Sequence, residues 1–308
     1  MMLRTDAPHA ERVVVGFDGS DPALLALDRA AEEAERRTAS LEVVCGWPWG
    51  LHLPKTDTDP REKRQPPTSR TRPDEGQMLY DAGRAVTDAA LERVRSRFPD
   101  LRTMPHLTTE PAARALVRAG RDAGLTVVGT RGHGGFTGLL LGSVGLRVAA
   151  HCTGPLLVVR GGNAPSRGVV LVGLASEADG DAVRFGFEEA RRRGAALRVL
   201  HAWQHRGVPG VLPAAELYWE GADDQRQCQA AVPAFATAVL REEFPDVEVR
   251  TESVYQGAGQ ALVEASADAD VVVLATHRPR HPLGLQLGPV THAVLHHAHC
   301  PVALVPVT

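Results

Sequence analysis

Residues 13–20 read VVVGFDGS, and the apolar part of this stretch returns as VLVG at residues 170–173. Each copy is a short β-branched run that ends at a glycine, which is typical of a buried strand in a parallel sheet. A second match links RRTASLEVVCGW at 36–47 to RRGAALRVLHAW at 192–203. These repeated patterns indicate that the chain carries one structural unit twice.

The later halves of the two copies align without a gap from Phe98 onward. The repeated positions include two glycines, two histidines and two prolines: Gly142 and Gly288, His151 and His297, Pro155 and Pro301. We therefore expect two domains, residues 1–162 and 163–308. Each has an ordinary length for a domain with a single hydrophobic core.

The first copy carries extra residues between Trp47 and Phe98. They fall in 50–76, a stretch rich in Pro, Thr, Asp and Arg without the apolar spacing of a helix or strand. Such a composition predicts a mobile loop.

Strand and helix patterns alternate along the first copy. Asp21-Pro22 supplies an N-cap followed by proline in the first turn of a helix. The predicted strands are 13–17, 41–47, 101–107, 125–130 and 155–160. The predicted helices are 24–37, 78–97, 110–123 and 143–152. This order predicts an α/β protein whose two tandem Rossmann-like domains each hold a five-stranded, mainly parallel sheet with helices on both faces.

The composition excludes several classes of protein. With 44% hydrophobic and 23% charged residues, the chain is not mainly disordered. A formal net charge of −3 disfavours a dedicated nucleic-acid binder.

The cysteines and the apolar runs bear on the compartment. Cys45, Cys152, Cys228 and Cys300 have no CxxC spacing, which predicts reduced thiols. The first residues lack the apolar core of a signal peptide, and no run is long enough to span a membrane. We expect a soluble cytoplasmic protein without a membrane partner.

A glycine-rich stretch, GTRGHGGFTGLLLGSVG, follows the fourth predicted strand at 129–145, and Ser143 begins the next helix. Ligands of such folds bind beyond the carboxyl ends of the strands, where the strand order switches. Glycines let backbone N–H groups approach an anion, and a helix N-terminus attracts the same charge. The stretch predicts a phosphate site, with a flexible βα loop as the alternative. It is neither a Walker A loop nor a dinucleotide fingerprint.

Asp18 follows the first predicted strand. Its carboxylate could accept hydrogen bonds from an adenine amino group or a ribose hydroxyl. The alternative is that Asp18 only caps a turn with Gly19 and Ser20. Residues 44–46 end the neighbouring strand and would offer a backbone and apolar wall for a base. Because these features meet at one switch point, they favour a nucleotide site.

Gly129-x2-Gly132-x9-Gly142-Ser143 matches G-x2-G-x9-G-[ST], the ATP-binding signature of the universal stress protein family. The VVVGFDGS opening and the ending at 151–159 resemble the same family. The resemblance covers nearly the whole chain twice, so it implies a tandem universal stress protein with adenine nucleotide alpha hydrolase-like domains.

The resemblance also implies ATP, accompanied by Mg²⁺, as the ligand of the first domain. Asp18 and Gly46 would contact adenine or ribose, and the glycine loop would hold ribose and phosphates. The expected binding residues are Gly16, Phe17, Asp18, Ser20, Val44, Gly46, Gly129, Arg131, Gly132, His133, Gly142, Ser143 and Val144.

The second copy departs from this signature. The positions of Gly129, Gly132 and Ser143 are taken by Ala275, Arg278 and Pro289, and Asp18 is matched by Ala175 or Leu174. A side chain replaces a phosphate-facing glycine, and proline removes an N–H group. We expect the second domain not to bind ATP in the family's manner. The alternative is that Arg278 and Arg280 attract an anion by charge.

The family's domains commonly pair through their final strands across a pseudo-twofold. Residues 155–160 and 301–307 would do so within this chain, as an intramolecular pseudo-dimer. A homodimer is a further possibility.

The second copy also holds a group of histidines followed by Cys300: His277, His281, His292, His296, His297 and His299. His292 and His296 share a helix face, so both could contact one zinc or copper ion. No acidic residue lies nearby in the sequence, and His297 repeats His151. The pattern favours surface histidines, so we expect no metal ligands.

The leading function is an ATP-binding regulatory or stress-response protein with a conformational output. One alternative is a slow ATPase. Only Arg131 and His133 could assist phosphoryl transfer, and a Walker lysine and acid are absent, so no catalytic residue is assigned. Another alternative is a nucleotide-free, dimerising scaffold.

Overall fold

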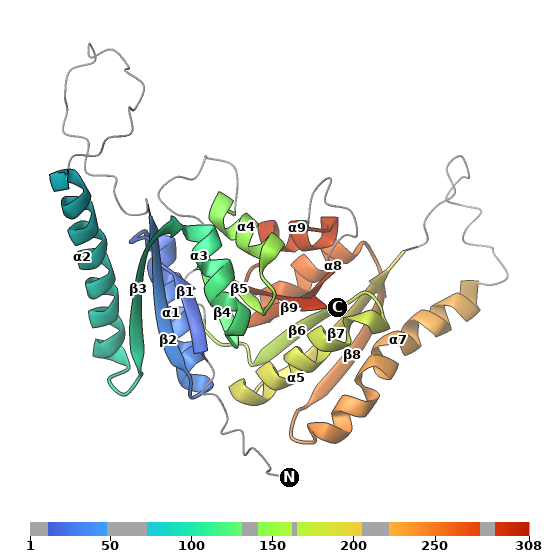
Figure 1. Cartoon of the computed structure of the whole chain (residues 1–308). Coiled ribbons are helices and arrows are strands. Elements are labelled where there is room, and N and C mark those ends of the chain that lie inside the picture. The colour runs from blue at the N-terminus through green and yellow to red at the C-terminus, as the bar shows by residue number, and fades with distance from the viewer. Residues whose placement is uncertain are drawn as a thin grey trace, which may run out of the picture. The chain divides into compact units, whose positions relative to one another are not determined.

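The computed structural model describes residues 12–47, 73–130, 141–161, 165–204, 222–277 and 287–307. The chain divides into two compact units, Met1–Val148 and Ala149–Thr308 (Figure 1). The repeat boundary at residue 162 stays a prediction, since the compact units divide within a helix of the first repeat.

The first unit holds a parallel sheet in the order β3-β2-β1-β4. Its strands are β1 (Arg12–Gly16), β2 (Ser40–Trp47), β3 (Thr103–Pro111) and β4 (Leu125–Gly129). Its helices are α1 (Asp21–Arg36), α2 (Pro73–Arg97), α3 (Ala112–Ala119), the 3₁₀ turn η1 (Gly120–Asp122) and the start of α4 (Ser143–His151).

The second unit holds a sheet in the order β5-β10-β9-β6-β7-β8. The strands are β5 (Leu156–Val159), β6 (Val169–Leu174), β7 (Ala196–Trp203), β8 (Val249–Tyr255), β9 (Val271–His277) and β10 (Val302–Val307). The helices are α5 (Gly180–Arg193), α7 (Ala222–Glu243), α8 (Ala258–Ala265) and α9 (Pro289–His297), with 3₁₀ turns η2 (Glu177–Asp179) and η3 (Ser266–Asp268).

The five strands of the second repeat are all parallel, whereas β5 pairs antiparallel with β10. Leu157 lies opposite Ala303 in this pairing. The expected pairing of the final strands of the two repeats is therefore present. The predicted α/β fold, two tandem repeats with mainly parallel strands, is confirmed.

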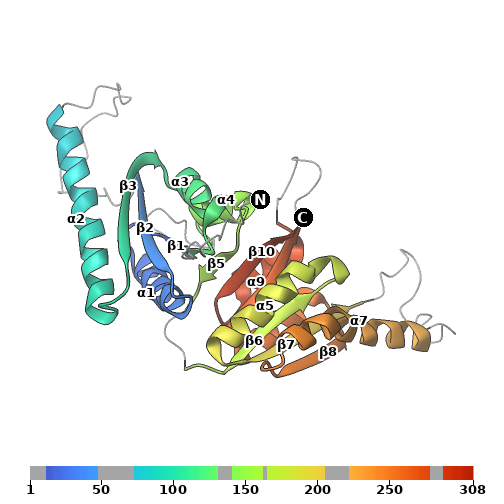
Figure 2. The ribbon, with the colours of Figure 1, turned by 60° about the horizontal axis from the view of Figure 1, so that its bottom comes forward.

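Helices cover both faces of each sheet (Figure 2). In the first unit α1 and α2 pack against each other, while α3 packs on β1, β2 and β3. In the second unit α5 packs with α7, and α8 packs with α9. Sheets buried on both faces need strands that are apolar throughout, and Val13–Val15 and Val170–Val172 are 0% exposed.

Three helix starts differ from the prediction. Helix α3 begins at Ala112 and not at residue 110, because residues 110 and 111 still belong to β3. Ser20, not Asp21, is the N-cap of α1, and its side chain accepts a hydrogen bond from the Ala23 N–H at 3.4 Å. Helix α2 begins at Pro73, so residues 73–76 of the expected loop are helical; residues 50–72 lie outside the described residues. The predicted helix start at residue 78 was wrong because Pro73 and its polar neighbours break the apolar spacing of the first turn.

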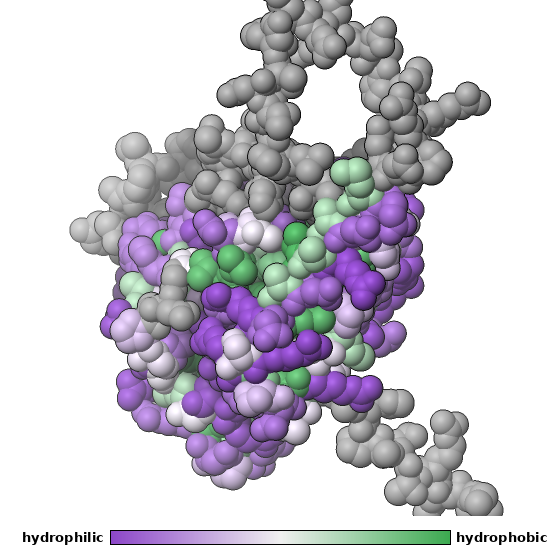
Figure 3. Space-filling view, turned by 90° about the vertical axis from the view of Figure 1, so that its left-hand side faces the viewer, coloured by the Kyte–Doolittle hydropathy of each residue, from purple (hydrophilic) through white to green (hydrophobic). Residues whose placement is uncertain are grey.

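Helix α2 presents Met78 and Tyr80 to solvent, with exposed fractions of 66% and 51%. The side of the molecule on which this helix lies is otherwise mostly hydrophilic, with a narrow hydrophobic band (Figure 3). The helix packs on β2 and β3, and Met78 and Tyr80 are large apolar side chains on its solvent-exposed side.

Both repeats bury a carboxylate near the end of their first long helix. Glu33 of α1, 0% exposed, pairs with Arg37, the C-cap residue of this helix. Glu189 of α5, 2% exposed, pairs with Arg193 at 3.1 Å. Removing one partner of a buried pair leaves an uncompensated charge, which costs several kcal/mol. The repeated pairs are thus part of the shared scaffold.

Asp270 fixes the entry to β6. Its carboxylate accepts hydrogen bonds from the backbone N–H of Arg167 at 2.6 Å, the N–H of Gly168 at 2.9 Å and the hydroxyl of Ser166 at 2.8 Å. Burial raises the pKa of Asp270, but the hydrogen bonds outweigh it and hold the pKa below its ordinary value.

Asp270→Asn should lower the free energy of unfolding at pH 7 by about 1–2 kcal/mol, because the amide cannot accept every bond. In the wild type the folded-state pKa is depressed, so the contribution is full above the unfolded pKa of about 4 and fades as pH falls through the folded value. Urea unfolding at pH 7 and pH 3 measures both effects. Asp268→Asn, which removes an exposed charge nearby, is the control. An equal loss in the two variants would contradict this role.

Candidate functional site

Strand β1 lies between β2 and β4 and is parallel to both. Their carboxyl ends therefore share one edge of the sheet, marked by Gly16, Gly46 and Gly129. The chain proceeds from β1 to β2 on one side and returns to β4 on the other, so this edge is a switch point of the strand order.

The ends of β1 and β2 form an apolar wall. The Phe17 N–H donates to the Val44 carbonyl at 2.9 Å, and both residues are at most 5% exposed. The Val44 carbonyl is therefore already engaged in the sheet. Both residues are apolar and lie almost fully buried behind the edge.

Asp18 organises a turn after β1. Its Oδ1 accepts hydrogen bonds from the Ser20 N–H at 3.0 Å and the Ser20 hydroxyl at 2.6 Å, and Gly19 has a φ of +82°. Asp18 therefore stabilises the turn that was considered as its alternative role.

The charge of Asp18 also reaches Cys45 of β2. Burial raises the pKa of the Cys45 thiol, a hydrogen bond with Thr87 lowers it, and the charge of Asp18 raises it. Asp18 thus also acts on the end of β2.

Two site glycines are required by packing. A Cβ on Gly46 would lie 2.6 Å from the Ala112 Cα at the start of α3. A Cβ on Gly129 would lie 2.6 Å from the Pro22 carbonyl oxygen in α1. Glycine at these positions brings helix starts against strand ends, which explains both residues without a ligand.

Helix α4 begins beside the end of β4. The Gly142 N–H donates to the Thr130 carbonyl at 2.7 Å, and Gly142 in turn accepts from the Leu146 N–H at 3.0 Å. The first N–H groups of a helix have no partner within it. The first N–H groups of α4 therefore lie at the switch point. Ser143 is exposed there, and Val144 is half-buried.

The structure gathers most of the expected residues at this edge. The described members are Gly16, Phe17, Asp18, Ser20, Val44, Gly46, Gly129, Gly142, Ser143 and Val144. Arg131, Gly132 and His133 lie outside the described residues.

The corresponding edge of the second repeat holds a carboxylate that the sequence comparison missed. Asp179, 1% exposed, accepts hydrogen bonds from the N–H groups of Ala175 at 2.6 Å and Ser176 at 3.2 Å. His277 Nε2 lies 2.7 Å from its other oxygen. The spacing Ser176-x-x-Asp179, which forms a capping box, was the available signal.

Helix α9 confirms the predicted consequence of Pro289. It begins at this proline, and its N-cap residue, Gly288, supplies no side-chain hydrogen bond. The helix therefore presents one fewer N–H group than α4 at its start.

Among the described residues, no three or more His, Cys, Asp or Glu side chains are grouped to hold a metal ion. No described helix is both long and apolar enough to cross a membrane.

The chain is similar to universal stress proteins in both of its repeats. The model of the universal stress protein family matches residues 9–160 and 167–306. A universal stress protein of Mycobacterium tuberculosis is 30% identical over 94% of this chain and 93% of its own length.

Solved structures agree on the fold. A universal stress protein of Archaeoglobus fulgidus covers 97% of this chain and 99% of its own at a TM-score of 0.65 and 13% identity. A universal stress protein in complex with cAMP matches 49% of this chain and 97% of its own at 28% identity, with a TM-score of 0.34 that is too low to transfer its ligand. The family model covers both repeats, so the chain belongs to the universal stress protein family.

Proposed function

We propose that the first repeat binds ATP and that the protein acts as a nucleotide-dependent regulatory or stress-response protein. The observation that carries this proposal is the start of α4 at the switch point, fixed by the Gly142–Thr130 hydrogen bond. There the helix N-terminus follows the G-x2-G-x9-G-S signature and adjoins the ends of the parallel strands.

The geometry suggests a role for each part of the edge. Phosphates would lie against the glycine loop and the first N–H groups of α4. The base and ribose would lie toward Phe17, Val44 and the carboxylate of Asp18. Mg²⁺ commonly keeps several waters and binds nucleotide phosphates with few protein ligands.

We propose that the second repeat does not bind ATP. Asp179 accepts hydrogen bonds from the backbone N–H groups of Ala175 and Ser176, so these donors are not available to a phosphate. Pro289 also removes a donor from α9. The repeat would then serve as a structural partner through the β5–β10 pairing.

A scaffold without nucleotide is the second candidate. It is favoured by Gly46 and Gly129, whose packing against α3 and α1 accounts for both glycines without a ligand. Packing does not account for the exposed Ser143 or for the full spacing of the signature, so we place ATP binding first. A homodimer and weak hydrolysis stay predictions.

The purified protein should release one ATP or ADP per chain on denaturation, and a stripped sample should bind one ATP. Quantification of released nucleotide and calorimetric titration measure this stoichiometry. Two nucleotides per chain would contradict the silent second repeat. None, together with no binding on titration, would favour the scaffold, while turnover of bound ATP with Mg²⁺ would indicate an ATPase.

Gly132→Arg should weaken ATP binding at least about tenfold, or about 1.4 kcal/mol, because a long side chain would enter the phosphate site. The substitution copies Arg278 of the second repeat. Arg278→Gly is the matched control and should leave ATP affinity unchanged. Circular dichroism checks the fold. Unchanged affinity in Gly132→Arg would overturn the site assignment.

Asp18→Asn separates the two roles of Asp18. The amide oxygen can still accept the bonds from Ser20, so the turn should persist, while the lost carboxylate oxygen should weaken ATP by roughly 1–3 kcal/mol. Asp18→Ala should lower both ATP affinity and the melting temperature. If Asn leaves affinity intact and Ala affects only stability, Asp18 is a turn residue alone.

A further inference from the structure

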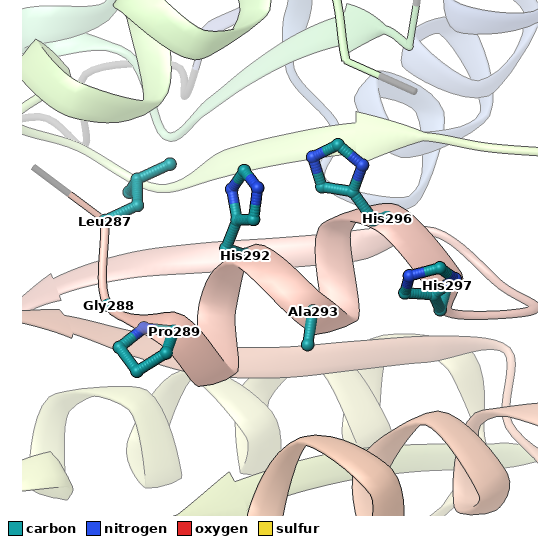
Figure 4. A pocket seen from close by; sticks show the side chains of 7 residues that line it. All are labelled: Leu287, Gly288, Pro289, His292, Ala293, His296 and His297. Atoms are coloured by element: carbon teal, nitrogen blue, oxygen red, sulfur yellow. The ribbon is translucent and has the colours of Figure 1, made fainter. Parts of the chain in front are cut away.

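Helix α9 carries a pair of histidines that the proposed function does not use. His292 and His296 are one helical turn apart, and their ring centroids are 4.2 Å apart with an interplanar angle of 45°. Figure 4 shows both rings on the same side of the helix, away from Pro289 and Ala293. The third ring, His297, lies 6.2 Å from His296.

The pair borders an open pocket of about 540 Å³. Leu287, Gly288 and Pro289 also line it at the start of the helix, together with Ala293 and His297. Both histidines are half-buried, so part of each side chain is accessible to solvent. The space in front of the rings is large enough for an ion and several waters.

The ring separation is close to that of a shared metal ligand pair. Imidazole nitrogens bind zinc at about 2.0–2.1 Å, which places two rings of one tetrahedral site roughly 5 Å apart between centroids. Small side-chain rotations from 4.2 Å would reach that spacing. Residues four apart on a helix are neighbours on one face, so the backbone needs no change.

Only the neutral form of imidazole donates a lone pair to a metal, so metal ions and protons compete for the pair. Arg160, whose guanidinium donates to the Leu295 carbonyl, adds a positive charge that limits the affinity.

We propose that His292 and His296 form a two-histidine site for a divalent transition metal such as Zn²⁺ or Cu²⁺, with water filling the remaining positions. Imidazole is a preferred ligand of these ions, whereas Mg²⁺ and Ca²⁺ prefer oxygen. The sequence alone favoured surface histidines because no acidic residue is close. The two neighbouring imidazole rings beside an open pocket instead favour a metal site.

The site lies on the second repeat and does not depend on ATP binding in the first. Affinity should follow the ligand type, with Cu²⁺ bound more tightly than Ni²⁺ and Co²⁺, and Mg²⁺ not bound at the pair. This order distinguishes an imidazole site from general attraction of cations to an acidic surface.

The test is calorimetric titration of the full-length, metal-stripped protein with Zn²⁺ and with Cu²⁺. His292→Ala and His296→Ala should each weaken one Zn²⁺ site at least about tenfold, since even loss of an outer partner costs that much. His299→Ala, an exposed histidine just beyond the helix, is the matched control and should change nothing.

Electron paramagnetic resonance of the Cu²⁺ form supplies a second readout. Coupling to two nitrogens should be seen in the wild type and in His299→Ala, and to one nitrogen in either single variant. Circular dichroism separates loss of the site from loss of the fold. Equal Zn²⁺ affinity and equal Cu²⁺ coupling in the wild type and the two single variants would overturn the proposal.

Discussion

Parallel hydrogen bonding of β1 to β2 on one side and β4 on the other sets the geometry of the first repeat. Because all three strands run in the same direction, every side chain that follows a strand end emerges at one edge. Asp18, Gly46 and the Thr130–Gly142 hydrogen bond all lie at this edge. The contacts that hold them there are contacts within the protein. The candidate site is therefore a product of strand order, and local substitutions decide what it can hold.

The two repeats illustrate that separation between scaffold and edge. The buried pair on α1, Glu33 with Arg37, has its counterpart on α5 in Glu189 with Arg193. A second contact is kept with its residues exchanged. Glu42 of β2 contacts His106 of β3, whereas Arg198 of β7 contacts Glu252 of β8, so the carboxylate lies on the other strand of the pair. The edge has diverged more freely, since water can solvate most of what is placed there.

Much of the fold was predictable from the sequence, because strands buried on both faces need continuous apolar runs such as 13–15 and 170–172. The signature spacing also located the edge residues. The sequence could not reveal that Gly46 and Gly129 are demanded by neighbouring helices, since contacts between distant segments leave no local pattern. Asp179 escaped notice for a related reason. Its carboxylate reaches back to the strand end from a 3₁₀ turn, so alignment by position compares the wrong residues.

The antiparallel pairing of β5 with β10 has a consequence for how the repeats associate. Without β5, strand β10 would be an edge strand, and its apolar residues, including Val302 and Leu304, would offer a template to any free strand in solution. Here a short chain segment connects β5 to the repeat that contains its partner. Tethering gives the pairing an effective concentration in the millimolar range, far above that of separate molecules in dilute solution. Because both strands belong to one chain, their pairing does not depend on the concentration of separate molecules.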